Sequence, residues 1–162
     1  LYEAGLPKEW CRTIICENAD AEKLVTDPRV AFFTFIGSGA VGWMLHSKLA
    51  PGTRCALEHG GTAPVIVDHD ANLNDILPLI AKGGFYHAGQ VCVSVQKVYL
   101  HESLVDSFSK GLIELAENLV VGDPLDEKTE VGPLILEREV NRIDQWVQEA
   151  KNEGGKILSQ EK

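Results

Sequence analysis

The stretch VAFFTFIGSGAVGWML, residues 30–45, decides the fold class. Its first seven residues are continuously apolar or β-branched, which is typical of a strand that is covered on both faces in a parallel sheet. Gly37 ends this run, and the chain then enters GAVGWMLHSKLA, residues 39–50, whose apolar spacing predicts a helix that ends at Pro51-Gly52. A strand, a glycine-rich turn and a helix in this order predict α/β architecture.

The same alternation continues along the chain. Short runs rich in apolar and β-branched residues predict further strands at residues 11–15, 63–68 and 91–100. Apolar residues at helical spacing predict helices at residues 70–84 and 103–120, and a last one that carries Val140, Ile143, Val147 and Ala150 and ends near Gly154. Strands that alternate with helices predict a layered α/β fold with a doubly wound, mostly parallel sheet.

Capping residues predict where two of these helices begin and end. Asp70 is the expected N-cap of the helix at 70–84, the glycines at 83 and 84 are its expected end, and Pro78 is expected to kink or shorten it. Ser103 and Asp106 resemble a capping pair at the start of the next helix.

The charge balance argues against nucleic acid and anionic membranes as partners. The 162 residues include 15 Lys and Arg against 24 Asp and Glu, which gives a formal net charge of -9. No cluster of basic residues is present that would follow a phosphate backbone. No apolar run approaches the roughly 20 residues that span a bilayer.

The cysteines and the two chain ends indicate where such a protein works. Cys11, Cys16, Cys55 and Cys92 form no CxxC pair, so reduced thiols in the cytoplasm are expected, and no metal site is expected from the spacing of Cys and His. The first residue is not Met, the N-terminus lacks the features of a signal peptide, and both ends read as interrupted elements. We therefore expect a piece of a longer protein.

The turn GSGAVG satisfies the GxGxxG pattern at Gly37, Gly39 and Gly42, after a strand and before a helix. Free backbone amides and the helix dipole at such a turn can hold a pyrophosphate. The alternative is that the glycines only permit a tight turn. The usual dinucleotide fingerprint also places an acidic ribose ligand about 20 positions later, which here would be Glu58.

Glu58 has two competing interpretations of its own. In LEHGGTAPVIV, two adjacent glycines leave it beside a backbone with little side-chain cover, just before a buried strand. A carboxylate at that position can face a cleft. The ordinary alternative is a solvated turn glutamate.

Cys92 lies in FYHAGQVCVSVQ, residues 85–96, where the chain is expected to enter a strand. Alternation of side chains places Val91, Val93, Val95 and Lys97 on one face and Cys92, Ser94, Gln96 and Val98 on the other. Because Cys92 shares its face with polar residues, a nucleophile is as plausible as a small buried filler. A cysteine hydrolase or acyltransferase that uses Cys92 with His87 is a further alternative, and a catalytically silent binding domain is another.

Several motifs in the same order resemble the aldehyde dehydrogenase superfamily, and the resemblance covers nearly the whole chain. The motifs are EAGLP at 3–7, GSxxxG at 37–42, LExGG-xxPxIV at 57–67, F-xxx-GQxC at 85–92 and VGDPLDxxTxVGP at 121–133. The chain departs from the common pattern at His59, where Leu is usual, and at Ser94, where Ala or Gly is frequent.

The resemblance implies roles for six residues. It makes Cys92 the nucleophile and Glu58, 34 positions earlier, the general base rather than a ribose ligand. The cofactor-binding residues that it implies are Gly37 and Ser38 at the pyrophosphate, Val41 beside the adenine and Gly42 in the turn.

The resemblance also implies an activity and a domain organisation. The parent protein would oxidise an aldehyde to a carboxylic acid with NAD or NADP through a cysteine thioester, as a homodimer or homotetramer. Residues 1–60 would be the C-terminal part of the NAD(P)-binding domain, and residues 61–162 the N-terminal part of the catalytic domain. The fragment itself is expected to be inactive, because other family site residues lie outside it.

Overall fold

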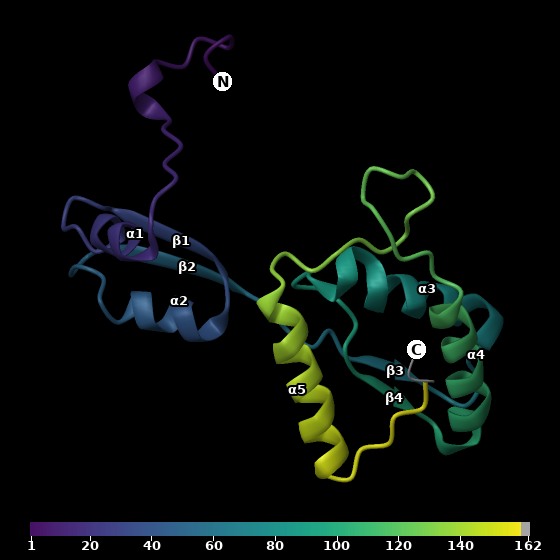
Figure 1. The fold of residues 1–162 in the computed structure, drawn as a ribbon. Coiled ribbons are helices and arrows are strands. Elements are labelled where there is room, and N and C mark those ends of the chain that lie inside the picture. Colours follow the sequence, from purple (N-terminus) through teal and green to yellow (C-terminus); the bar gives the residue numbers. More distant parts are fainter. Residues whose placement is uncertain (160–162) are drawn as a thin grey trace. The chain divides into compact units, whose positions relative to one another are not determined.

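The structure is a computed structural model that describes residues 1–159, and the chain divides into two units, Leu1–His59 and Gly60–Lys162. The elements of unit 1 are η1 (Lys8–Trp10), α1 (Asn18–Val25), β1 (Phe32–Gly37), α2 (Gly39–His46) and β2 (Arg54–His59). The elements of unit 2 are β3 (Val65–Val67), α3 (Leu73–Phe85), η2 (Tyr86–Gly89), β4 (Val98–Leu100), η3 (Glu102–Leu104), α4 (Val105–Glu117) and α5 (Arg138–Asn152) (Figure 1).

Unit 1 is built around one strand–helix–strand motif. β1 and β2 pair in parallel, with Phe32 opposite Arg54 and Gly37 opposite His59, and α2 connects them. Ser38 caps α2, because its Oγ accepts a hydrogen bond from the backbone N–H of Val41 at 3.4 Å. The strand and the helix predicted from residues 30–45 are thus confirmed.

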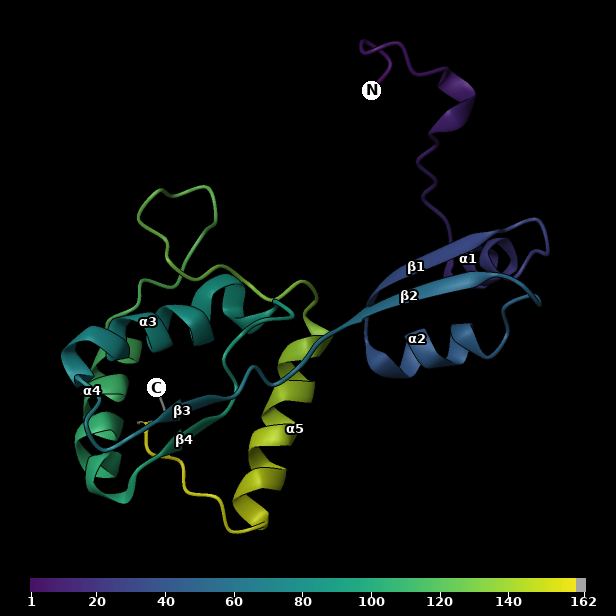
Figure 2. The ribbon, with the colours of Figure 1, turned by 180° about the vertical axis from the view of Figure 1, so that it is seen from behind.

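Unit 2 repeats the motif with different elements. β3 and β4 pair in parallel from Val65 opposite Val98, and α3 lies in the connection between them. Figure 2 shows the two strands of each sheet side by side. The core consists of Val67 from β3, Ile80 from α3 and Phe108 from α4, all buried. Parallel strands joined through helices confirm the predicted α/β class.

Two predicted strands are wrong in whole or in part. Residues 11–15 form no strand in the described structure, and Ile15 is 99% exposed, because no neighbouring strand receives their backbone hydrogen bonds. The strand predicted at 91–100 shortens to β4. Residues 91–94 form a turn that the hydrogen bond from Ser94 N–H to Val91 C=O closes at 3.0 Å.

That turn also overturns the predicted alternation of faces around Cys92. Ser94, on the face predicted to be polar, is fully buried, whereas Val93, on the face predicted to carry valines, is 62% exposed. The next backbone amides bond in different directions: Val95 donates to Gly83 C=O and Gln96 donates to Thr62 C=O, each at 3.0 Å. Period-2 alternation requires a regular ladder, and the chain has none here.

The predicted helix ends also need correction. Asn72, not Asp70, caps α3, since its side chain accepts from Asn74 N–H at 3.1 Å. The helix passes Pro78 and both glycines before it ends at Phe85. A Cβ on Gly84 would lie 3.3 Å from Val95 C=O, so this glycine permits close approach of the segment after Cys92 rather than ending the helix.

The next helix likewise begins at a different cap. The His101 side chain, not the Ser103 and Asp106 pair, caps the short η3 turn, since it accepts from Ser103 N–H. α4 then follows directly from η3.

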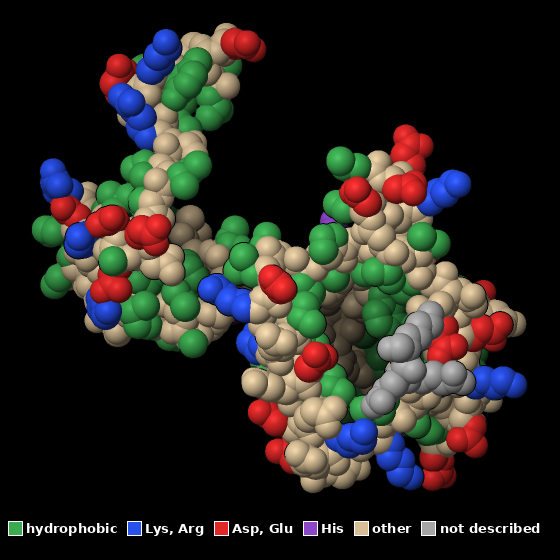
Figure 3. Space-filling view, viewed as in Figure 1, with side chains coloured by type: hydrophobic (Ala, Val, Ile, Leu, Met, Phe, Trp, Pro, Cys, Tyr) green, Lys and Arg blue, Asp and Glu red, His purple; other side chains and the backbone are tan. Residues whose placement is uncertain are grey.

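Much apolar surface remains uncovered in the described chain. The predicted apolar stripe of α5 is largely exposed, with Val140 and Val147 both open to solvent. Unit 2 is hollowed on the face drawn in Figure 3, and hydrophobic side chains surround the hollow. Among the described residues, no helix has both the length and the apolar character that crossing a membrane requires.

Candidate functional site

At two positions near the start of α2, close neighbours leave little room for any residue other than glycine. A Cβ on Gly37 would lie 2.6 Å from the ring of Phe35, and a Cβ on Gly42 would collide with Nε2 of His59. Both positions therefore exclude side chains, so the glycines have a packing reason as well as the predicted binding role.

The first turn of α2 offers hydrogen-bond donors. The amides of Gly39 and Ala40 have no intrahelical partner by helix geometry, while Ser38 satisfies those of Val41 and, through its carbonyl, Gly42. The positive end of the helix dipole lies at the same turn. This arrangement suits an anion such as a phosphate group.

An apolar groove of about 460 Å³ adjoins this turn. It lies between α1, β1 and α2, and its walls include Val25, Phe33, Val41 and Met44. Val41 thus contributes its amide to the helix start and its side chain to the groove. A flat apolar ring would fit such a groove, which has the volume range of small-molecule sites.

His59 occupies the space beneath α2. Its ring lies edge-on to Phe35 and Trp43, with centroid separations of 6.5 Å and 6.0 Å. Its Nε2 is buried and makes no hydrogen bond to any described residue. The histidine that departs from the family pattern therefore packs directly against Gly42.

This packing predicts that Gly42→Ala destabilises the chain by about 1–3 kcal/mol, because the new methyl group forces the imidazole from its site. In a double-mutant cycle measured by urea unfolding, His59→Ala should recover part of that loss. Gly39→Ala is the matched control, since its Cβ would lie at an ordinary 3.7 Å from His59. An equal cost of Gly42→Ala with and without His59 would contradict the packing argument.

Glu58 lies at the carboxyl end of β2, opposite Ile36 of β1. Its side chain is exposed and makes no hydrogen bond or ion pair with the described residues. Because parallel strands end at the same edge, Glu58 and the glycine turn after β1 gather at one edge of the unit 1 sheet. Ligands of open α/β sheets bind at that kind of edge.

Cys92 carries a free, exposed thiol in the turn of residues 91–94. Three consecutive residues before it adopt left-handed backbone conformations: His87 (φ 50°), Ala88 (φ 54°) and Gly89 (φ 72°). Such angles are strained for residues with a Cβ, and strained segments gather at functional sites. The chain therefore presents Cys92 on a constrained loop.

Unit 2 brings the last glycine of the LEHGG motif beside the GQVC motif. A Cβ on Gly61 would lie 3.9 Å from the carbonyl oxygen of Cys92, and Gln96 N–H donates to Thr62 C=O at 3.0 Å. Gly61, three positions after the predicted base, thus passes beside the backbone of the predicted nucleophile. Glu58 itself belongs to unit 1.

His87, the other predicted partner of Cys92, lies against a different side chain. The ring of His87 lies against Tyr86, with centroids 5.0 Å apart. No hydrogen bond in the described residues joins His87 to Cys92, so nothing in the geometry favours the hydrolase dyad. A hollow of about 540 Å³ between α3, α4 and the residues that follow α4 includes neither residue.

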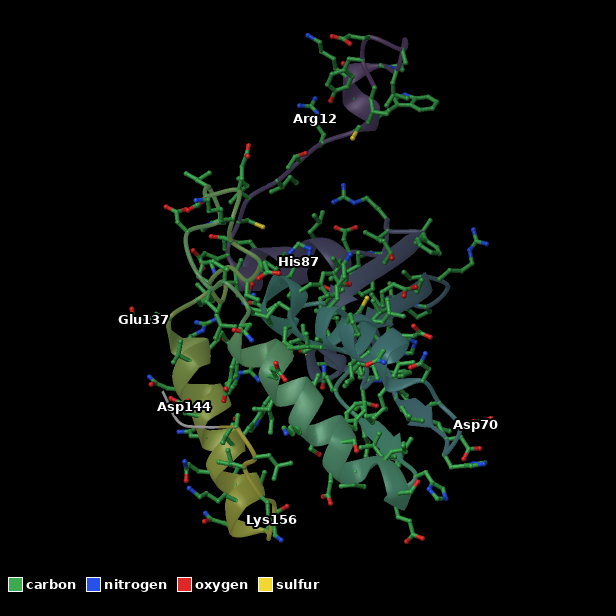
Figure 4. All side chains as sticks on the ribbon, turned by 90° about the vertical axis from the view of Figure 1, so that its right-hand side faces the viewer. Arg12, Asp70, His87, Glu137, Asp144 and Lys156 are labelled. Carbon is green, nitrogen blue, oxygen red and sulfur yellow. The ribbon has the colours of Figure 1, made fainter. Side chains whose placement is uncertain are left out.

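One group of possible metal ligands was not expected from the sequence. Asp68, His69 and Asp70 place their ligand atoms within 4.8 Å of one another, and all three are exposed (Asp70 is labelled in Figure 4). A hydrogen bond from His69 lowers the pKa of Asp68 below its ordinary value. The consecutive D-H-D letters were the available signal. The group lies at the carboxyl end of β3, whereas Cys92 precedes β4.

Comparison with known proteins places the chain in a family. The family model described as aldehyde dehydrogenase family matches residues 1–162. The chain is 42% identical to the 3-sulfolactaldehyde dehydrogenase of Priestia aryabhattai over 97% of its own length and 33% of that protein. It is also 42% identical to the lactaldehyde dehydrogenase of Methanocaldococcus jannaschii, over 85% of its length and 29% of that protein. The chain belongs to the aldehyde dehydrogenase family.

Solved structures agree with this assignment. The glyceraldehyde-3-phosphate dehydrogenase of Methanocaldococcus jannaschii, complexed with NADP, is 41% identical with a TM-score of 0.81, over 85% of this chain and 30% of that one. A betaine aldehyde dehydrogenase variant from Staphylococcus aureus, with NAD+ and a BME-modified cysteine, is 30% identical with a TM-score of 0.91, over 97% of this chain and 32% of that one. The chain spans about a third of the length of the curated relatives.

Proposed function

We propose that the full-length protein oxidises an aldehyde to a carboxylic acid with NAD(P)+, with Cys92 as the nucleophile and Glu58 as the general base. The observation that carries this proposal is the free, exposed thiol of Cys92 on its constrained loop, beside the glycine segment that follows Glu58. Family membership supplies the reaction class. The betaine aldehyde dehydrogenase structure contains NAD+ and a BME-modified cysteine, which supports a reactive cysteine in the proposed site.

Unit 1 fits the cofactor, and residues 1–60 are proposed as part of its domain. The free amides at the start of α2 would receive the pyrophosphate near Gly37, Ser38 and Gly42, and the groove beside Val41 would receive the adenine. When bound, NAD(P)+ supplies a hydride acceptor.

Two side chains, Cys92 and Glu58, carry out the proposed steps. The Cys92 thiolate attacks the aldehyde carbon and forms a carbon–sulfur bond, which gives a thiohemiacetal. The oxygen of this intermediate, as its anion, re-forms the carbonyl as a hydride leaves the carbon for the cofactor, and a thioester remains on Cys92. Glu58 then takes a proton from water as the water attacks the thioester, and the acid leaves with Cys92 regenerated. Transfer of the acyl group to coenzyme A would not need this base, so Glu58 favours hydrolysis.

The first test is whether the full-length protein reduces NAD+ or NADP+ with an aldehyde. The names of the relatives make lactaldehyde, 3-sulfolactaldehyde and betaine aldehyde the first substrates to try. We expect the absorbance at 340 nm to rise as the cofactor is reduced, and only when both aldehyde and enzyme are present. Ester cleavage without any nicotinamide, and no reduction with any aldehyde of the panel, would support a cysteine hydrolase instead. No activity of either kind would support a silent binding domain.

Two further properties belong to the proposal. Four free cysteines favour a reducing compartment such as the cytoplasm. The homodimer or homotetramer expected from the resemblance remains a prediction, which sedimentation of the full-length protein would check.

A further inference from the structure

One side chain joins two motifs of unit 2 that lie more than 40 residues apart. The Gln90 carboxamide donates from Nε2 to Pro133 C=O at 3.4 Å and accepts at Oε1 from Ile135 N–H at 2.9 Å. Its Nε2 also donates to His87 C=O at 3.0 Å. Gln90 therefore uses both ends of its amide, as a backbone peptide group does in a sheet.

On one side, this amide holds the segment that leads into α5. The bridge between Val121 and Val131 ends before residues 132–137, and α5 begins at Arg138. In the described structure, the hydrogen bonds that tie residues 132–137 to distant parts of the chain are those of Gln90. Figure 4 labels Glu137 at the start of α5.

On the other side, the amide holds the loop before Cys92. His87, labelled in Figure 4, adopts a left-handed conformation, as does Ala88, and His87 C=O accepts from both the backbone N–H of Gln90 at 3.1 Å and its side-chain Nε2 at 3.0 Å. Left-handed angles at two residues with a Cβ cost energy that surrounding contacts must offset. Gln90 supplies such contacts two positions before Cys92.

We infer that Gln90 is a positioning residue for Cys92: its carboxamide fixes the left-handed loop of residues 87–89 against residues 133–135 and so sets where the thiol stands. This inference rests on the proposed role of Cys92 as nucleophile. The chemistry selects glutamine, because the site needs one donor toward two carbonyls and one acceptor toward an N–H. A glutamate of the same length loses the donor and sets a negative charge against both carbonyl oxygens.

The test uses Gln90→Ala and Gln90→Glu in the full-length protein. We expect kcat to fall by up to ~100-fold, as for a reacting group displaced by about an ångström. The Kd for NAD(P)+ should stay unchanged, because the proposed cofactor residues belong to unit 1. Gln96→Glu is the matched control, since the Gln96 side chain is exposed and makes no hydrogen bond to the described residues.

A pH profile separates positioning from mere loss of stability. A free glutamic acid titrates near pH ~4.3, and its protonated form regains a donor. The kcat of Gln90→Glu, relative to the unmodified protein, should therefore rise several-fold as the pH falls from 8 to 5.5. The ratio for Gln90→Ala should stay flat. This comparison remains valid even where Gln90→Ala folds poorly.

The outcomes distinguish this inference from the proposed function. If Cys92→Ser keeps full activity, the proposed function fails and Gln90 has no nucleophile to position. If Cys92→Ser is inactive but both Gln90 variants match the unmodified protein, the inference alone is overturned. Two other results also overturn it. One is a loss of kcat in Gln90→Glu that does not recover at lower pH, and the other is an equal weakening of cofactor binding.

Discussion

Replacing Cys92 with serine in the full-length protein is expected to lower kcat/KM for aldehyde oxidation by at least ~1,000-fold. The two side chains differ by one atom, so the turn of residues 91–94 should keep its hydrogen bond from Ser94 to Val91. A serine hydroxyl is not ionised at neutral pH, whereas a thiol supplies some thiolate. Oxygen is also the poorer leaving group at the acyl step, so both formation and hydrolysis of the intermediate should slow.

The other three cysteines provide the control for this variant. Cys11, Cys16 and Cys55 are also free thiols, but none lies in a constrained loop of this kind. A protein with all three changed to serine should retain aldehyde oxidation. Mass spectrometry after brief treatment with iodoacetamide should show Cys92 alkylated in step with loss of activity. Undiminished oxidation by Cys92→Ser would reject the mechanism.

The features that could be predicted from sequence depend on neighbours close in the chain. The strand–turn–helix at residues 30–45 is specified by a continuous apolar run, a glycine turn and the Ser38 cap, all within 16 residues. The first part of the strand predicted at residues 91–100 could not be predicted correctly, because the amides of Val95 and Gln96 bond to Gly83 and Thr62, which pattern analysis cannot place. Local signals determine an element, while distant partners determine where it ends.

The candidate site shows the same division. The motifs singled out Cys92 and Glu58 as candidate reactive side chains, and the family resemblance implied their roles as nucleophile and general base. No sequence pattern indicates that Gln90 bonds to Pro133 and Ile135, because glutamine has no characteristic spacing and its partners lie 43 and 45 residues away. Side-chain bridges of that kind become visible only when the fold brings the segments together.

Replacing Glu58 with glutamine should separate the two halves of the reaction. The Cys92 thioester can form without a base, so the first turnover should release about one reduced cofactor per active site. Steady turnover should then fall by about 100- to 10,000-fold, the range that general base catalysis supplies. Stopped-flow absorbance at 340 nm measures the burst and the steady rate in one experiment. Glutamine keeps the size and hydrogen-bonding ability of the side chain, which is exposed in unit 1.

Two comparisons make the Glu58 result decisive. Glu17→Gln alters another exposed unit 1 glutamate that makes no side-chain capping bond, and it should leave both phases unchanged. The steady rate of Glu58→Gln should rise at alkaline pH, because hydroxide attacks a thioester without needing a base. Normal steady turnover in Glu58→Gln would remove Glu58 as the base. Loss of the burst together with the steady rate would instead place Glu58 before the thioester, in activating Cys92 or in binding the cofactor.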